Sequence, residues 1–516
     1  MAAANPQKTV GVPRQVARVG SGPRLNPGGK QRSMGTKVDS RTKFFYGIGS
    51  VAFGVKDSGF AFFLLFYYGQ VLGLPPSRVG LGILIALVCD AIVDPIVGHA
   101  SDHLHSRWGR RHPFMYAAAI PVGLAFWMLF APPRGLEGDG LFAYFVGMAV
   151  LVRLFIAVYE IPSTALVAEL SDDYDERTAM MSLRYLLGWW GGLVMAVIAY
   201  GVLLHPTPAQ PIGQLNIEGY RVYGLIAALL MVSAILVSAL GTHRHIPNLK
   251  SPPPAQPFEL RRMLRELAES LANRNFLALF LGGLFGAAAA GLSSALSIYF
   301  STFFWSLTAE QMLWLVLAYF PAALLAFAVT PRISARWGKK QAALATGLAG
   351  FTLIPVPIVL RLLDVMPENG SSTLLPTLAT FTMIEIALVI TSSILVSAMV
   401  ADIVEESELR TGRRSEGTFF AARMFVQKMV SGLGVLGSGL LLTAVGFPAG
   451  AKPGEVPPET LWWLGAVYAP IVAGLYLGSM ACLLPYRIDR EGHRQNLARL
   501  MAAAEQDHET PAALAP

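Results

Sequence analysis

Two aspartates, Asp90 and Asp94, stand four residues apart in a long apolar segment of the sequence. On a helix this spacing places both carboxylates on one face. Two anions this close in a medium of low dielectric repel each other, so the pair needs a cation or a shared proton. Pro95 follows directly and can loosen the helix, because it donates no backbone hydrogen bond. The motif predicts a site for Na⁺ or H⁺; the alternative is a pair that Lys56 or Lys428 neutralises permanently.

Four further ionisable side chains lie within apolar segments. At the bilayer centre such a group costs at least ~2.5 kcal/mol on insertion scales, so each one requires an explanation. Lys56 and Asp57 are adjacent, Glu160 lies two residues before Pro162, and Arg184 lies in the next apolar segment. Carboxylates and a guanidinium in a water-filled cavity suit a ligand with many hydroxyl groups. We therefore predict that these four residues bind substrate; for Arg184 the alternative is a salt bridge that holds helices together.

Three more charges in apolar segments, Arg153, Glu385 and Lys428, are predicted to couple ion binding to substrate binding. For Arg153 a purely structural salt bridge fits equally well. Glu385 has no obvious partner in the sequence, and its role stays open between structure and function.

The elements that must position these residues are membrane-spanning helices. Of the 516 residues, 54% are hydrophobic and 14% are charged, whereas soluble domains carry about 25% charged residues. A spanning helix needs about 20 largely apolar residues. Twelve segments qualify, namely 44–71, 78–101, 114–132, 141–168, 179–204, 222–242, 276–303, 310–331, 341–362, 374–402, 418–445 and 461–486. The sequence therefore predicts an all-α integral membrane protein with twelve transmembrane helices.

The distribution of Lys and Arg predicts the orientation, because loops rich in these residues stay on the cytoplasmic side. With the N-terminus inside, 30 of the 40 Lys and Arg residues face the cytoplasm. We expect both termini to be cytoplasmic and the protein to reside in the plasma membrane, which is the inner membrane if the source is a Gram-negative bacterium. The same bias explains the excess of basic residues without a nucleic acid partner, and membrane lipid is the expected surroundings.

Two short motifs repeat at nearly the same offset. Arg107 to Arg111 after the second segment matches Arg336 to Lys340 after the eighth, and Val167 to Leu170 matches Val400 to Ile403. Both repeats lie on the same membrane side, so two parallel six-helix halves are expected, which is the architecture of the major facilitator superfamily. A gating or structural role is predicted for Gly98, Asp102, Arg107, Gly109, Arg110, Arg111, Arg336, Gly338 and Lys339.

The repeat and the charge distribution divide the chain into five parts. They are a disordered basic cytoplasmic tail (1–43), an N-terminal six-helix bundle (44–242), a cytoplasmic linker with an amphipathic helix (243–275), a C-terminal six-helix bundle (276–486) and a cytoplasmic C-terminal tail (487–516).

Several motifs together resemble those of the glycoside–pentoside–hexuronide:cation symporters, a family of the major facilitator superfamily, in its melibiose permease-like form. The motifs are Phe53 to Asp57, Asp90 to Pro95, Glu160 to Pro162, Asp175 to Arg177, and Gln427 with Lys428. The resemblance covers nearly all twelve segments, and Asp-x-x-x-Asp-Pro is its most specific element. Pro95 to Phe114, with Gly98 and Asp102, is also similar to sucrose–proton symporters.

The resemblance implies sugar:cation symport by alternating access. It implies that Asp90 and Asp94 hold the coupling ion, and that Lys428 engages this acidic pair when no ion is bound. It also implies that Asp57, Glu160 and Arg184, with Lys56 nearby, hydrogen-bond the sugar.

Two positions depart from the family pattern. Ala157 stands where the pattern has a threonine ligand for sodium, so H⁺ is as good a candidate as Na⁺. Thr164 stands where the pattern has a tryptophan that stacks on the sugar; it is kept as a candidate substrate-binding residue, and the sugar stays open.

Other functions are weighed against symport. A cation-coupled transporter of lysolipids or other amphiphiles would share the aspartate pair, but Lys56, Asp57 and Glu160 add polarity that a lipid tail does not need. A non-transporting membrane sensor would need a signalling domain. Neither a nucleophile–base arrangement nor a phosphate loop occurs, so an enzyme is not expected. Cys89 and Cys482 have no metal-ligand spacing, and no metal or cofactor is expected beyond the coupling ion.

Overall fold

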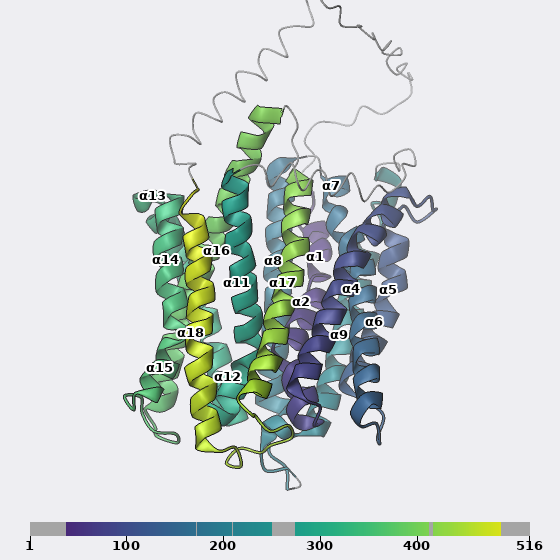
Figure 1. Cartoon of the computed structure of the whole chain (residues 1–516). Coiled ribbons are helices and arrows are strands. Elements are labelled where there is room, and N and C mark those ends of the chain that lie inside the picture. The colour runs from purple at the N-terminus through teal and green to yellow at the C-terminus, as the bar shows by residue number, and fades with distance from the viewer. Residues whose placement is uncertain (1–37, 172, 209, 250–273, 412–415, 487–516) are drawn as a thin grey trace, which may run out of the picture. The chain divides into compact units, whose positions relative to one another are not determined.

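The computed structural model describes residues 38–171, 173–208, 210–249, 274–411 and 416–486 (Figure 1). At 174, 175, 248, 400–411 and 416–427 it describes the backbone alone. The regular secondary structure of the described residues is helical, apart from one isolated bridge between Thr207 and Gln210. The tail 1–37, most of the linker and its amphipathic helix, and the tail 487–516 lie outside the described residues. The first helix begins at Ser40, within the predicted tail.

The helices follow one another in the order predicted, several of them in consecutive pieces. They are α1 (Ser40–Ile48), α2 (Val51–Ser58), η1 (Gly59–Phe63), α3 (Leu64–Phe66), η2 (Tyr67–Val71), α4 (Pro76–His103), α5 (His112–Phe130), α6 (Gly138–Ala165), α7 (Val167–Leu170), α8 (Tyr174–Ile198), η3 (Ala199–Leu203), η4 (Gly213–Leu215), α9 (Ile217–His243), η5 (Ile246–Asn248), α11 (Arg274–Tyr299), η6 (Phe300–Phe304), α12 (Ala309–Leu317), α13 (Tyr319–Trp337), α14 (Lys339–Leu353), α15 (Val356–Leu362), α16 (Leu374–Thr411), α17 (Glu416–Ala444) and α18 (Pro458–Leu483).

Each of the twelve predicted spans coincides with one helix or one run of consecutive helices. Among the described residues, eleven segments are long and apolar enough to cross a membrane. The predicted span 418–445 corresponds to α17, whose described apolar part is the shorter Lys428–Ala444. Helices suit the lipid interior because they satisfy every backbone hydrogen bond within one segment. The predicted all-α membrane fold is confirmed.

The two repeated loops each contain a glycine with a positive φ angle. Gly109 and Gly338 both have positive φ, at 73° and 77°, a region that glycine enters without steric cost. Gly338 directly joins α13 to α14, whereas Gly109 lies within the loop between α4 and α5. The described residues form one compact unit, and the boundary between two halves stays a prediction from the repeat.

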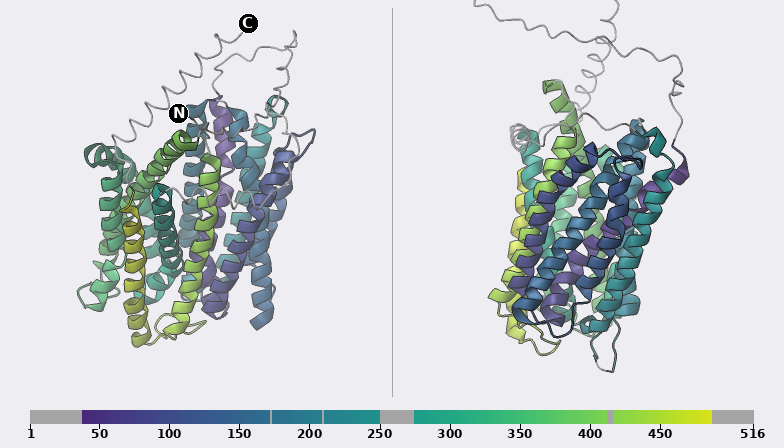
Figure 2. Two further views of the ribbon diagram at one scale, coloured as in Figure 1. Left: turned by 45° about the horizontal axis from the view of Figure 1, so that its top comes forward. Right: turned by 90° about the vertical axis from the view of Figure 1, so that its right-hand side faces the viewer.

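Neighbouring helices pack along much of their length (Figure 1, Figure 2). α4 packs against α6 and α17, α2 against α8, α5 against α6 and α9, and α11 against α17 and α18. Glycines allow the closest crossings, for example Gly54 of α2 against Gly188 of α8. These packings bring the charged residues of α4, α6 and α17 within reach of one another.

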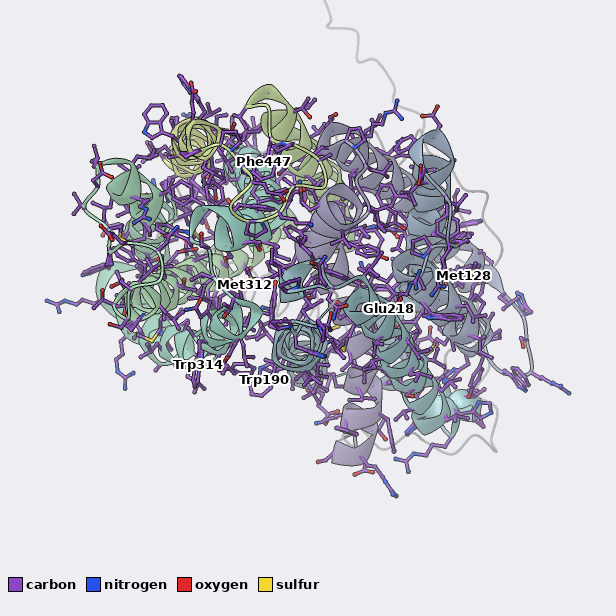
Figure 3. All side chains as sticks on the ribbon, turned by 90° about the horizontal axis from the view of Figure 1, so that it is seen from below. Met128, Trp190, Glu218, Met312, Trp314 and Phe447 are labelled. Atoms are coloured by element: carbon purple, nitrogen blue, oxygen red, sulfur yellow. The ribbon has the colours of Figure 1, made fainter. Side chains whose placement is uncertain are left out.

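We call the end of the bundle at which α1 begins the proximal end and the opposite end the distal end. Figure 3 views the distal end, where Glu218, Met312 and Phe447 are labelled. Buried aromatic side chains of the first helical run fill this end, such as Phe63 and Tyr67 against Tyr220.

Candidate transport site

Four charged side chains from three helices meet in one group, which we call the four-charge group: Asp90, Asp94, Arg153 and Lys428. Arg153 Nη1 donates to Asp90 Oδ2 at 3.0 Å. Lys428 Nζ donates to Asp94 Oδ2 at 2.6 Å and lies 3.3 Å from Asp90 Oδ2. The group links α4 to α6 and to α17, which are far apart in the sequence.

The structure thus places Lys428, one of the two predicted neutralising cations, on the aspartate pair. Lys56, the other, forms its ion pair with Asp57 instead. Sequence reasoning did not identify Arg153 as the partner of Asp90. Asp90 is 2% exposed and Arg153 is 6% exposed, so both charges are withdrawn from solvent and depend on each other.

Two buried polar atoms in the four-charge group lack a hydrogen-bond partner among the described residues: Asp94 Oδ1 and Arg153 Nε. Buried polar groups normally have partners. Asp94 has a free acceptor oxygen beside its bond to Lys428, and that oxygen can take a proton or contact an ion. Asp94 is also less deeply buried than Asp90.

The predicted substrate residues lie on α2, α6 and α8. Lys56 Nζ and Asp57 Oδ1 are 2.5 Å apart, with the lysine side chain buried and the Asp57 side chain 58% exposed. Glu160 is half-buried on α6. Arg184 is buried on α8, and its Nη2 donates to Ser163 Oγ of α6 at 3.0 Å.

Arg184 is held in place from several sides. Its guanidinium lies 5.6 Å from the ring centre of Tyr46 and 5.5 Å from that of Phe53, distances at which a cation is attracted to a ring face. Its Nη1 is buried and has no hydrogen-bond partner among the described residues. Arg184 therefore keeps one free N–H donor. Its contact with Ser163, three residues after Glu160, places this donor next to α6.

Thr164 and Glu385 are less suited to the roles predicted for them. The Thr164 hydroxyl donates to the carbonyl oxygen of Glu160 at 2.7 Å, so its proton is used within α6. Glu385 is half-buried on α16 and has no hydrogen bond or ion pair with another described residue. The structure does not bring it to the four-charge group.

The predicted gating loop at the proximal end closes on one carboxylate. Arg110 Nε and Arg111 Nε donate to Glu169 Oε1 at 2.8 and 3.0 Å, and Arg111 also pairs with Asp102. Arg107 is exposed and lies over the ring of its neighbour Trp108. Gly98 lies one helical turn before Asp102 on α4, next to Ile161 of α6.

Glu169 was missed as a site residue, although the repeat of Val167 to Leu170 gave a signal. Its counterpart Asp402 lies outside the described side chains. In the second loop Arg336 is exposed in the last turn of α13, and Lys339 begins α14. Lys340 Nζ donates to the carbonyl oxygen of Leu484 at 2.7 Å, near the end of α18.

At the same end, His245 connects α1 to the region after α9. Its Nε2 lies 3.0 Å from Thr42 Oγ1, and Arg244 Nη2 donates to the same hydroxyl at 2.7 Å. Burial, and then the positive charge of Arg244, lower the pKa of His245. The imidazole is therefore kept neutral over a wider pH range than an exposed histidine.

Contacts at the distal end join helices before residue 243 to helices after residue 274. Gln214 Nε2 donates to the carbonyl oxygen of Leu307 at 2.6 Å, and Tyr299 packs edge-on against Phe66 with ring centres 5.3 Å apart. Gln70 Nε2 donates to the carbonyl oxygen of Pro448 at 3.4 Å. In the described part of the chain, the hydrogen bonds between these two sets of helices lie at this end or at the four-charge group.

Comparison with known proteins agrees with a transport fold. Residues 45–490 match the family described as MFS/sugar transport protein. An uncharacterized symporter of Synechocystis sp. is 27% identical, over 92% of this chain and 98% of the relative. The isoprimeverose transporter of Lactiplantibacillus pentosus is 25% identical, over 92% of this chain and 93% of the relative. The crystal structure of a D-xylose–proton symporter superposes with a TM-score of 0.57 at 14% identity, over 87% and 97% of the two chains.

Proposed function

Because the chain belongs to the MFS/sugar transport protein family, we propose that it is a secondary active transporter for sugars. It carries a glycoside or oligosaccharide together with H⁺ or Na⁺ by alternating access. Relatives named as a symporter and as an isoprimeverose transporter support a sugar cargo and a coupling ion. The observation that carries the proposal is the four-charge group, in which ion pairs join α4 to α6 and to α17.

The ion acts on the contact between Lys428 and the aspartate pair. Lys428 Nζ lies 2.6 Å from Asp94 Oδ2. An ion or proton bound to Asp94 neutralises its carboxylate, and this weakens the electrostatic attraction between Asp94 and Lys428. Releasing Lys428 loosens α17 from α4. Ion binding therefore changes the contact between two helices that alternating access must move.

The sugar binds beside this group, on the residues of α2, α6 and α8. Asp57 presents an exposed carboxylate, and Arg184 presents a buried guanidinium with one unused donor. A carboxylate that accepts and a guanidinium that donates can each engage two hydroxyl groups of one ring. Glu160 supplies a second carboxylate, whereas Thr164 contributes its hydroxyl only as an acceptor.

Alternating access requires one end of the transporter to close while the other opens. The hydrogen bonds of Gln70 and Gln214 and the Phe66–Tyr299 contact hold the distal end together. We infer that the distal end is extracellular, that both termini are cytoplasmic, and that the protein resides in the plasma membrane. The ion pairs of Glu169 with Arg110 and Arg111 then brace the cytoplasmic end.

The energy available to such a symporter is sufficient for accumulation. A membrane potential of 100 mV supplies about 2.3 kcal/mol for each charge moved inward. At about 1.4 kcal/mol per factor of ten, one charge per sugar supports a gradient of roughly 50-fold.

Proteoliposome uptake tests the proposal. Purified protein is reconstituted, and a panel of radiolabelled sugars that includes isoprimeverose, melibiose and D-xylose is offered with a pH gradient or a Na⁺ gradient imposed separately. We expect at least one sugar to accumulate above equilibrium under one gradient. Uptake that only equilibrates under every gradient would contradict symport, and uptake of lysolipid alone would replace the sugar.

A further inference from the structure

The helices α4 and α6 run side by side with a constant register. The contacts that define it are Gly82 with Phe145, Asp90 with Arg153, and Gly98 with Ile161. In each pair the residue of α6 follows its partner by 63 positions in the sequence. The same register places Ala157 of α6 level with Asp94 of α4. α6 therefore presents a guanidinium to one aspartate and a methyl group to the other.

Arg153 gives Asp90 a fixed counter-charge. The two side chains are 7% and 1% exposed, and their closest atoms are 3.0 Å apart. The guanidinium also lies 4.5 Å from the ring centre of Phe60, which adds a cation–π attraction and limits its movement. An arginine side chain does not lose its proton in proteins. Asp90 is thus neutralised by the protein itself, before any ion arrives.

Two fixed positive charges already lie at the aspartate pair. Arg153 pairs with Asp90, and Lys428 pairs with Asp94 and Asp90, while the half-buried Glu160 of α6 also acts electrostatically on Lys428 and Asp94. A metal ion placed between the two aspartates would be repelled at short range by the guanidinium and the ammonium group. Hard cations also need several oxygen ligands. Here one aspartate oxygen is occupied by Arg153, and Ala157, which is 1% exposed, has no oxygen to offer.

We propose that Arg153 is a built-in counter-cation that excludes Na⁺ from the aspartate pair, so that transport by this chain does not depend on Na⁺. Arg153 is then the residue that determines ion specificity. This inference rests on the proposed symport function for its consequence in transport, but Na⁺ binding itself can be measured without a sugar.

The experiment measures the thermal unfolding midpoint of the purified full chain in NaCl and in choline chloride. A ligand that binds only the folded state raises the midpoint. For wild type we expect the same midpoint in both salts, within about 1 °C. Arg153→Gln combined with Ala157→Thr removes the counter-cation and adds an oxygen, and we expect 100 mM NaCl to raise its midpoint by at least about 2 °C.

Arg153→Lys is the matched control, because it keeps the positive charge and should keep Na⁺ out. A Na⁺-dependent rise of the wild-type midpoint would overturn the inference. So would a folded Arg153→Gln/Ala157→Thr variant, with a normal gel-filtration profile, that ignores Na⁺. If that variant does not fold, the wild-type and Arg153→Lys titrations still decide the question, since Na⁺ stabilisation of either protein contradicts exclusion.

Uptake separates this inference from the proposed function. Accumulation under a pH gradient and the same uptake rate, within about two-fold, when choline replaces Na⁺ would support both. Accumulation driven by a Na⁺ gradient would overturn the role of Arg153 and leave symport standing. Absence of accumulation under both gradients would overturn symport, while the Na⁺ titration of the purified protein would still test Arg153.

Discussion

Replacing Gly54 by alanine is expected to separate α2 from α8. A Cβ atom on Gly54 would lie 1.7 Å from the carbonyl oxygen of Gly188 and 2.6 Å from its carbonyl carbon. Ordinary contacts of this kind measure 3.4–4 Å. Because both partners are backbone atoms, no side chain can rotate away, and the two helices must move apart by roughly 2 Å at the crossing.

The cost of this movement exceeds the gain that alanine normally brings to a helix. Overpacking costs about 1–3 kcal/mol and sometimes more, and a backbone contact belongs at the upper end. Alanine in place of glycine returns about 1 kcal/mol of helix propensity. The net loss of stability should therefore be about 2 kcal/mol. Because α2 carries Lys56 and Asp57 and α8 carries Arg184, we also expect sugar uptake to fall at least about ten-fold.

The matched control is Gly147→Ala on α6, where a new Cβ would meet no other atom within 4 Å. The assay is thermal unfolding of both variants in detergent, followed by uptake in proteoliposomes. We expect a lower midpoint for Gly54→Ala, and a midpoint at or above that of wild type for Gly147→Ala. If the two variants have equal midpoints and equal uptake, the close crossing of α2 and α8 is wrong.

Three further substitutions test other parts of the structure. Lys428→Gln removes the cation closest to Asp94; we expect proteoliposome uptake to fall at least about ten-fold, with Lys428→Arg retaining more of it. Glu169→Gln weakens the bonds to Arg110 and Arg111. We expect about ten-fold slower transport in uptake assays, with unchanged sugar affinity in equilibrium binding. Uptake by a Glu169→Asp variant should stay closer to that of wild type. The lowered pKa of His245 means that the unfolded chain binds more protons just below pH 6.5, so this residue makes stability fall as pH decreases through that range. His245→Gln should reduce the change of the thermal unfolding midpoint with pH between about pH 5 and 7. An unchanged dependence on pH would contradict the lowered pKa of His245.

The membrane fold could be predicted because each span satisfies a local rule. A span needs about 20 apolar residues and hydrogen-bonds only within itself, so neither length nor type depends on distant residues. The pairing of Asp90 with Asp94 is equally local, since it follows from helical periodicity. The use of the Thr164 hydroxyl on the Glu160 carbonyl is local too, and the known tendency of threonine to bond four residues back in a helix could have revealed it.

Contacts between helices could not be predicted in the same way. The bond from Arg153 to Asp90 depends on the register of α6 against α4, and a shift of one residue along either helix would point a side chain elsewhere. The same holds for Glu169 with Arg110, and for Arg184 with Ser163. Glu385 was singled out only for its charge in an apolar segment, and its position on α16 places it near Tyr319, Tyr468 and Tyr476 rather than at the four-charge group.

Ion-coupled sugar transport is tested most directly by concentrative uptake in an Asp94→Asn variant. Proteoliposomes are placed in a solution of a radiolabelled sugar that wild type accumulates, and uptake is followed under the driving gradient. Asp139→Asn, whose side chain is 91% exposed, serves as the control. We predict that Asp94→Asn equilibrates the sugar but no longer accumulates it, while Asp139→Asn accumulates it as wild type does. Undiminished accumulation by Asp94→Asn would contradict the assignment of the coupling ion to this site.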